Sequence, residues 1–201
     1  MPASRSVFDD SVARGYEAWY ETPAGRRADA LEKAALERQL QRFPIADSVL
    51  DVGAGTGHFT RWLSAAGLAT VGLDLSAAML RHAQELDRGT WVQGHGCQLP
   101  FAADTFDLVA FITTLEFLPC PEHAVREALR VARQGLLLGV LNRWSPLGIR
   151  RQLTRLFRPS IYDTAHFYSI RDLKRLLRSA GGEQSRFVWQ TTVMPDWWPK
   201  W

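Results

Sequence analysis

The sequence predicts a doubly wound α/β fold built on a mostly parallel sheet, and three observations lead to it. From about residue 48 onward, short apolar segments alternate with amphipathic segments of helical period. A glycine-rich turn follows the first apolar segment. The length of 201 residues, with 46% hydrophobic and 22% charged residues, is ordinary for one globular domain and excludes disordered and fibrous classes. Parallel strands need crossover helices, so we expect helices on both faces of the sheet.

The N-terminal part predicts lid helices, over about residues 8–43, that precede the sheet. Apolar residues recur at helical spacing within 28–43, and Pro44 ends the pattern; they are Leu31, Ala35, Leu36, Leu40 and Phe43. The alternation of strand and helix then begins. Strands are predicted at 49–52, 69–73, 90–93 and 106–112, with helices at 59–66 and from Ser76 onward separating the first three.

The second half of the chain continues the pattern with a helix at about 122–133 and a strand at 136–141. An arginine-rich insert, about 142–168, follows this fifth strand. A helix capped by Ser169 extends to residue 178, and a sixth strand is expected at 186–192. We therefore expect a single domain over residues 1–201, decorated by the lid helices and the insert.

The turn after the first strand, Asp51-Val-Gly-Ala-Gly-Thr-Gly57, is the first candidate binding site. Glycines there let a ligand approach bare backbone, although close packing of strand and helix can also demand small residues. Asp74 ends the second strand about 20 residues later, where a carboxylate can accept both ribose hydroxyls of an adenosine or, alternatively, cap the next helix. The two features together favour an adenosine-containing cofactor.

Two adenosine cofactors compete for this loop. The NAD fingerprint is spaced Gly-x-Gly-x-x-Gly, whereas the loop here reads Gly-x-Gly-x-Gly. S-adenosylmethionine (SAM) carries a positive sulfonium and no pyrophosphate, which an acidic residue such as Asp51 at the head of the loop suits better. The alternative of an NAD(P)-dependent oxidoreductase is further weakened because no convincing Tyr-x-x-x-Lys pair is present.

Three segments, in order along the chain, carry a family resemblance. They are Val49-Leu-Asp-Val-Gly-Ala-Gly-Thr-Gly57, Gly72-Leu-Asp-Leu-Ser76 and Leu99-Pro-Phe-Ala-Ala-Asp-Thr-Phe-Asp-Leu-Val109. They are similar to the motifs of the class I SAM-dependent methyltransferases, a family that includes the ubiquinone and menaquinone biosynthesis enzymes. The resemblance covers about residues 16–179. It implies methyl transfer from SAM to a small-molecule acceptor, through O, N, C or S, with S-adenosylhomocysteine as the product.

The resemblance also implies a set of cofactor contacts. In such enzymes the loop amides hold the methionine part of SAM, Asp74 holds the ribose, and Leu75 and Met79 flank the adenine, although Met79 could equally belong to the core. Tyr16 or Tyr20, from a segment that folds over the cofactor, could face the sulfonium. The implied cofactor-binding residues are Tyr20, Asp51, Gly53, Ala54, Gly55, Asp74, Leu75, Met79, Gly96, Cys97 and Thr113.

The chain departs from the family pattern at two places. The acidic residue expected after Gly94, a partner of the adenine amino group, is replaced by His95, so that Gly96 and Cys97 would contribute through their backbone. Because of this change, the alternative that the chain is a relative that binds the cofactor without catalysis stays open. The usual Pro-Gly-Gly turn before strand five is replaced by Arg133-Gln134-Gly135, which we expect to alter only a surface loop.

Two residues are candidates for catalysis. Glu116 follows the fourth strand at the carboxyl edge of the sheet and could remove a proton from a hydroxyl acceptor, or it could be a capping or salt-bridged glutamate. His166 lies in the insert beside aromatic residues and could be a second base or merely pack there. Methyl transfer needs no covalent nucleophile, because the methyl carbon is already activated.

Charge and cysteine content limit the partners. The net charge is +3, the arginines concentrate between Arg143 and Arg178, and no nucleic-acid-binding signature accompanies them, which disfavours nucleic acid. The chain shows no signal-peptide pattern and no apolar run long enough to span a membrane, so we expect a cytoplasmic protein. Cys97 and Cys120 lack metal-ligand spacing, and we expect two reduced thiols and no metal site.

The C-terminal tail is rich in tryptophan, with Trp197, Trp198 and Trp201 close together. The resembling family adds a seventh, antiparallel strand after strand six, and no residues remain here to build it. We therefore expect the seventh strand to be missing. We also expect the tail to cover the sheet edge or to pair with a second copy in a homodimer.

Overall fold

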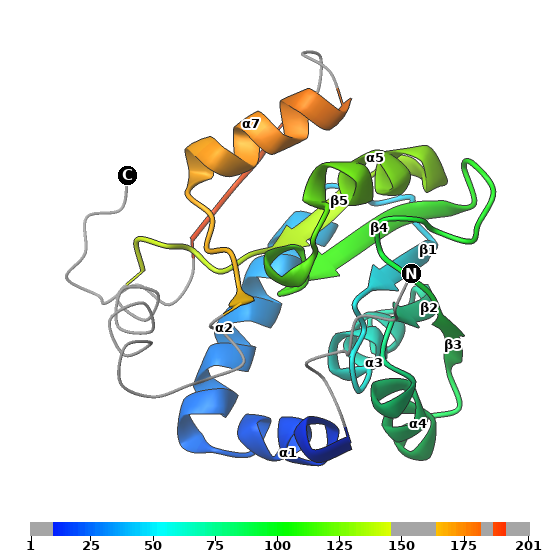
Figure 1. The fold of residues 1–201 in the computed structure, drawn as a ribbon, viewed down its shortest axis with the longest axis vertical. Helices are drawn as coiled ribbons and strands as arrows, with labels where there is room; N and C mark the ends of the chain where they lie inside the picture. Colours follow the sequence, from blue (N-terminus) through cyan, green and yellow to red (C-terminus); the bar gives the residue numbers. More distant parts are fainter. Residues whose placement is uncertain (1–9, 146–163, 182–186, 192–201) are drawn as a thin grey trace.

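The computed structural model describes residues 10–145, 164–181 and 187–191. A five-stranded sheet of order β3-β2-β1-β4-β5 forms its centre (Figure 1). All neighbouring strands in this sheet are parallel, which confirms the predicted doubly wound α/β class. The strands are β1 Ser48–Val52, β2 Ala69–Asp74, β3 Thr90–Gln93, β4 Phe106–Ile112 and β5 Ala132–Gly139.

Helices connect and cover these strands. The N-terminal part forms two helices, because Thr22 caps a new helix by accepting the Gly25 amide hydrogen at 3.0 Å and Pro23 occupies its first position. The helices are α1 Asp10–Tyr20, α2 Pro23–Leu40, α3 His58–Ala65, α4 Ala77–Leu86, α5 Pro121–Val131 and α7 Ile170–Gly181, with a short 3-10 helix, η1, at Leu115–Phe117.

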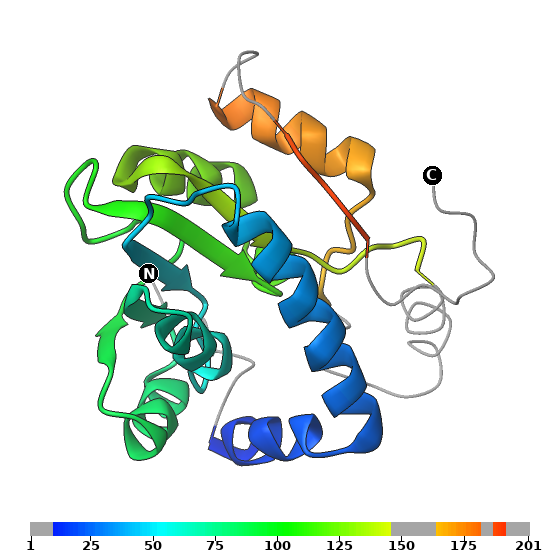
Figure 2. The same cartoon turned by 180° about the vertical axis from the view of Figure 1, so that it is seen from behind.

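Two apolar cores lie on opposite faces of the sheet. Strand β4 contributes to both because alternate side chains point to opposite faces. Leu108 and Ala110 belong to the core shared with α2 and α3, and Val109 and Phe111 belong to the core shared with α5. Figures 1 and 2 show α2 across one face and α5, with α7 outside it, across the other. The sheet is therefore buried on both faces, as the apolar sequence of β4 predicts.

The strand order creates a switch point between β1 and β4. From β1 the chain moves outward through α3 to β2 and through α4 to β3, then returns to place β4 on the other side of β1. Connections on the two sides leave the carboxyl edge in opposite directions, which opens a crevice there in folds of this type. The loops after β1, β2 and β4 meet at this position.

Helix α7 is amphipathic. Ser169 caps it: its hydroxyl accepts the Asp172 amide hydrogen at 3.2 Å, and the Asp172 carboxylate in turn accepts the Ser169 amide hydrogen at 3.1 Å. Leu173, Leu176 and Leu177 pack against the α5 core.

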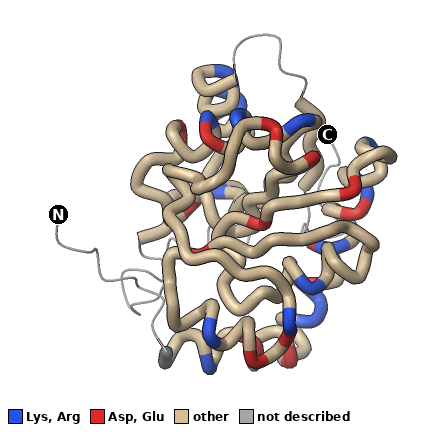
Figure 3. Tube along the Cα trace, turned by 90° about the vertical axis from the view of Figure 1, so that its right-hand side faces the viewer, with Lys and Arg blue, Asp and Glu red and all other residues tan. Residues whose placement is uncertain are grey.

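Basic and acidic residues are mixed over the face seen in Figure 3. In the described part of the chain, no helix is both long and apolar enough to cross a membrane.

The sixth strand predicted at 186–192 is not formed in the part that the structure describes. Residues 187–191 have no regular secondary structure. Gln190 instead donates to the Ala35 carbonyl of α2 at 2.6 Å, and the Lys174 ammonium of α7 lies 6.0 Å from the Trp189 ring. Contacts with two helices thus replace strand pairing. The tail at 194–201, predicted to cover the sheet edge or to mediate a dimer, and most of the insert lie outside the described residues.

The start of the fifth strand also differs from the prediction. It was expected at 136, but β5 begins at Ala132, directly after α5. Ala132 caps the end of α5 and is also the first residue of β5. Its backbone is extended, with φ −92° and ψ 134°. No turn separates the two elements, so turn residues could not mark the boundary.

Candidate functional site

The loop between β1 and α3 needs its glycines for different reasons. Gly53, Gly55 and Gly57 have φ of +77°, +58° and +81°, a left-handed conformation that favours glycine. A Cβ on Gly53 would lie 2.3 Å from the Thr114 side chain, and one on Gly57 would lie 2.2 Å from the Trp91 ring. A Cβ on Gly55 would meet nothing within 4 Å. Packing therefore explains Gly53 and Gly57, while the free side of Gly55 leaves room for a ligand.

Asp74 joins the loop to the end of β2. One carboxylate oxygen accepts the Gly55 amide hydrogen at 2.8 Å and the other accepts the Ser76 amide hydrogen at 2.8 Å. Burial raises the pKa of Asp74, and the hydrogen bonds from Ser76 and Gly55 oppose this shift. A carboxylate oxygen can accept more than one hydrogen bond, so both oxygens retain acceptor capacity for a ligand. The helix cap of α4 is provided by Ser76 rather than by Asp74.

Asp51 lies beneath the loop and is buried, with 2% of its surface exposed. Its carboxylate accepts the Thr60 hydroxyl hydrogen at 2.6 Å. Burial raises the pKa of Asp51 to about 6, the Thr60 hydrogen bond opposes the rise, and the negative charge of Asp74 adds to it. Two neighbouring carboxylates in a partly buried site favour a cationic ligand, because a positive charge would relieve their repulsion.

The residues predicted to flank adenine occupy different environments. Leu75 is 44% exposed beside Asp74 and offers an apolar surface. Met79 is 1% exposed within α4, which corresponds to the alternative that it belongs to the core. Gly96 and Cys97 were predicted to contact the adenine through their backbone. Gly96 is buried, and the Cys97 amide donates to Nδ1 of His95 at 3.1 Å. Leu75 is therefore the predicted adenine contact with accessible surface.

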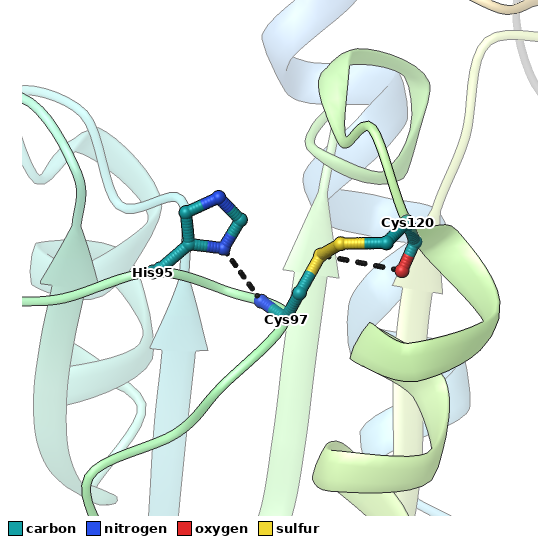
Figure 4. Close-up of side chains that lie close together, drawn as sticks. All are labelled: His95, Cys97 and Cys120. Carbon is teal, nitrogen blue, oxygen red and sulfur yellow. Dashed lines mark hydrogen bonds between the residues drawn. A yellow bond between two sulfur atoms is a disulfide. The ribbon is translucent and has the colours of Figure 1, made fainter. Parts of the chain in front are cut away.

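The expectation of two reduced thiols is wrong for this structure. Cys97 and Cys120 form a disulfide, and the described residues include no free cysteine (Figure 4). The physical reason is topological: the loop after β3 and the start of α5 meet at the carboxyl edge of the sheet. Residues separated by 23 positions in sequence thereby come into contact.

The loop after β4 places Thr114 against the glycine loop and ties Thr113 to the end of β5. Thr113 has φ +53°, which is rare for a β-branched residue, and its amide donates to the Gly139 carbonyl at 2.7 Å. Thr114 is buried and packs on Gly53. Ala54, on the same loop, is also buried and its amide donates to the Leu73 carbonyl at 3.0 Å. A strained backbone of this kind is common at functional sites.

Glu116, in η1, is 2% exposed. One carboxylate oxygen accepts the Leu141 amide hydrogen, while the other, Oε2, is buried without a hydrogen-bond partner. Burial raises the pKa of Glu116 to about 7, the Leu141 hydrogen bond opposes the rise, and the charge of Glu32 adds to it. A carboxyl group with a pKa near neutrality and a free oxygen can give or take a proton.

His166 meets Glu116 through the backbone only. Its amide donates to the Glu116 carbonyl at 2.8 Å, while its exposed ring packs edge-on against Tyr168 with centroids 4.7 Å apart. A parallel bridge between Asn142 and Tyr168 joins the two described ends of the insert next to this contact. The two predicted catalytic residues therefore lie on adjoining segments, with different environments for their side chains.

Known proteins share this arrangement. Residues 50–138 match a family model described as a methyltransferase domain. A ubiquinone/menaquinone biosynthesis C-methyltransferase of Roseobacter denitrificans is 31% identical over 149 residues, 69% of this chain and 55% of that protein. A SAM-dependent methyltransferase of Thermotoga maritima, described as a possible histamine N-methyltransferase, has 29% identity and a TM-score of 0.74, over 86% of this chain and 78% of that one. Residues 50–138 thus carry a methyltransferase domain, and the fold is that of the SAM-dependent methyltransferases.

The match to the family is partial in length. An uncharacterized protein of Mycobacterium tuberculosis is 34% identical over 184 residues, which is 90% of this chain but 61% of that protein. The chain thus spans about three fifths of the length of the first curated relatives that it matches. The family assignment concerns the domain that contains the glycine loop and Asp74.

The methyltransferase domain is contacted by α1 through residues that sequence reasoning missed. Glu17 of α1 accepts hydrogen bonds from the Thr56 hydroxyl of the glycine loop and from Arg61 of α3, the latter at 2.9 Å. Thr56 is fully buried. A hydroxyl in the middle of a glycine loop was the available signal, since a buried hydroxyl needs a partner.

The predicted sulfonium contact, Tyr20, ends α1 and lies over α3. Its ring stacks on the imidazole of His58 with centroids 3.7 Å apart and planes inclined by 7°. His58 in turn contacts Asp29 of α2 at 2.7 Å. Burial strongly raises the pKa of the Tyr20 hydroxyl. One face of the Tyr20 ring is thus used by His58, and this aromatic contact helps to hold α1 on the methyltransferase domain.

Proposed function

We propose that the chain is a SAM-dependent methyltransferase that acts on a small-molecule acceptor through O, N, C or S. The observation that carries this proposal is the bond between Asp74 and the Gly55 amide, which sets a ribose-binding carboxylate against an open glycine loop at the switch point of the sheet. The family relationship supports the same activity. The chain covers 61% of the M. tuberculosis relative. Any activity of a whole protein as long as that relative is therefore a proposal as well.

The described residues fit the cofactor. The open side of Gly55 can admit the methionine part, Asp74 has acceptor capacity for the ribose, and exposed Leu75 offers an apolar surface to the adenine. Asp51 and Asp74 provide negative charge toward a cation. SAM supplies a methyl group that is activated by a positively charged sulfur. The chain's own task is to position the acceptor and to keep water away.

Glu116 is proposed to hold or accept the acceptor's proton at Oε2. The atom is buried and without a hydrogen-bond partner, and the Leu141 amide fixes the rest of the carboxyl group. With a pKa of about 7 the group exchanges a proton near neutral pH. His166 is proposed as a substrate contact from the adjoining segment.

Calorimetric titration with S-adenosylhomocysteine and, separately, with NAD tests the proposal. We expect one equivalent of S-adenosylhomocysteine to bind and NAD to give no heat of binding. Binding of NAD alone would identify the oxidoreductase alternative instead. Glu116→Gln should then lower turnover more than it lowers affinity for S-adenosylhomocysteine, whereas an equal loss in both would make Glu116 structural.

A cofactor-binding relative without catalysis is the second candidate, and one observation favours it. His95 stands where the family has an acidic residue, and its Nδ1 takes up the Cys97 amide that could otherwise face the adenine. Tight binding of S-adenosylhomocysteine with no methyl transfer to a panel of phenols, amines, thiols and carbon acids would decide for this candidate.

The finer statements on partner and location are proposals as well. We place the protein in the cytoplasm, where SAM is abundant, and this is tested by cell fractionation. A homodimer through the tryptophan-rich tail at 194–201 is tested by light scattering on the chain and on a variant that lacks 196–201. A monomeric mass for the full chain would rule the dimer out.

A further inference from the structure

Three side chains capable of binding a metal gather at the carboxyl edge of the sheet, beside the proposed adenine position. They are His95, Cys97 and Cys120, and one ligand atom from each lies within 4.8 Å of the others. Within the described parts of the chain, they are the one group of three or more His, Cys, Asp or Glu residues with this proximity. All three are partly exposed, so an ion or a reductant can reach them.

The backbone holds the three residues in place from two sides. His95 and Cys97 lie on a tight turn after β3 that is closed by an antiparallel bridge from His95 to Gln98, in which the Gln98 amide donates to the His95 carbonyl at 2.9 Å. Cys120 directly precedes Pro121, the first residue of α5. Figure 4 shows Nδ1 of His95 directed toward Cys97 and the two sulfurs joined between the turn and the helix. The turn and the helix thus form the two sides of one site.

The ligand set matches a thiophilic divalent ion. Zinc in proteins takes cysteine sulfur at about 2.3 Å and histidine nitrogen at about 2.0 to 2.1 Å in tetrahedral geometry. That geometry requires sulfur–sulfur and sulfur–nitrogen separations of about 3.5 to 3.8 Å, which lie inside the spread of this cluster. Two thiolates would neutralise the charge of a divalent ion, and a water molecule could fill the fourth position.

We propose that His95, Cys97 and Cys120 bind a zinc-like divalent ion when the disulfide is open, so that disulfide and metal are alternative states of one site. An external dithiol opens the disulfide: the bond between the two sulfurs breaks, two S–H bonds form, and the dithiol is oxidised to its own disulfide. The ion then displaces the two thiol protons into solvent and takes the Nδ1 lone pair that now accepts the Cys97 amide. The proposal is independent of methyl transfer, because it concerns metal binding alone.

The test uses the full chain with Zn²⁺ as the probe, in competition with a chromogenic chelator, after reduction with a phosphine that is then removed without air. We expect reduced protein to bind one equivalent of Zn²⁺ and oxidised protein to bind none. Co²⁺ in place of Zn²⁺ should give the intense near-ultraviolet absorption of cobalt bound to thiolate. His95→Ala, Cys97→Ser and Cys120→Ser should each weaken Zn²⁺ binding at least about tenfold.

Matched variants keep the result interpretable. His82→Ala removes a histidine of α4 that contacts Glu85 and lies outside the cluster, and it should bind Zn²⁺ as the unaltered chain does. His95→Ala retains both cysteines and can still form the disulfide, so its thermal unfolding in the oxidised state shows whether the fold survives. The proposal is overturned if reduced protein binds no more Zn²⁺ than oxidised protein, or if His95→Ala binds as tightly as the unaltered chain.

Discussion

Asp74 uses its two carboxylate oxygens to hold two amides, one in the glycine loop and one at the start of α4. Asp74→Ala should therefore weaken binding of S-adenosylhomocysteine at least about tenfold, since loss of a charge-assisted hydrogen bond costs about 1.5 to 3 kcal/mol. Calorimetry measures this loss. Glu85→Ala, an exposed position on α4, serves as control and should leave the affinity unchanged. Unchanged affinity in Asp74→Ala would remove Asp74 from the cofactor site.

Glu116 should make the stability of the chain depend on pH. Its pKa is about 7 in the folded chain against 4.5 for the free group, so the folded state holds the proton more tightly. The stability that Glu116 contributes is therefore fully present below pH 4.5 and is lost as pH rises from 4.5 to about 7. Relative to Glu116→Gln, the unaltered chain should lose about 3 kcal/mol of unfolding free energy across this interval.

Urea unfolding of both proteins at several pH values measures the difference. Glu122→Gln on α5 is the control, because Glu122 is partly exposed and paired with Arg126. It should follow the pH dependence of the unaltered chain. Parallel curves for the unaltered chain and Glu116→Gln would show that the pKa of Glu116 is the same in the folded and unfolded chain, and the proposed proton transfer would lose its basis.

At the scale of elements, α1 is held on the glycine loop by a small polar contact. Glu17 accepts from Thr56 and Arg61, and its side chain is 28% exposed. Glu17→Ala should speed amide hydrogen exchange in α1 about fivefold, because such a partly exposed pair contributes about 1 kcal/mol. Exchange in α7 should stay unchanged, and Glu21→Ala, whose side chain is 83% exposed, should leave α1 as it is. Equal exchange in α1 of both variants would mean that other contacts hold the helix.

The elements that sequence alone predicts are those with strong local patterns. β4 was expected at 106–112 and occupies Phe106–Ile112. The prediction succeeds because an apolar run with polar residues on either side is visible in the local sequence. Residues 187–191 have a strand-like composition as well, yet contacts of Gln190 and Trp189 with α2 and α7 decide their conformation. The contact of Gln190 with α2 spans more than a hundred positions and leaves no periodic signal in the sequence.

The candidate site divides in the same way. The glycine loop and Asp74 were predictable because strand ends mark them, and the structure joins them by a direct hydrogen bond. The disulfide, the Glu17 contact and the orphan oxygen of Glu116 were not, since each depends on which segments meet in space. His95 could be recognised only as a departure from the family. Its partners required the folded chain.

At the scale of the whole molecule, the disulfide joins the β3 side of the sheet to α5 across 23 positions. Closing a loop of this length restricts the unfolded chain, and reduction should lower the unfolding free energy by about 3 kcal/mol. Urea unfolding with and without a reductant, in the presence of a metal chelator, measures the change. The Cys97→Ala/Cys120→Ala double variant should be insensitive to the reductant. Equal stability of the oxidised and reduced chain would show that the bridge does not stabilise the fold.

The contacts of Gln190 with α2 also constrain how the chain is assembled. Gln190 bonds Ala35 and Arg38, which precede it by 155 and 152 positions. During synthesis α2 leaves the ribosome long before residue 190 is made, so it must dock on the sheet without this partner. The contact can close only after β5 and α7 have been translated. The last described segment therefore forms a late contact between the first and final thirds of the chain, and we expect its loss to speed unfolding more than it slows folding.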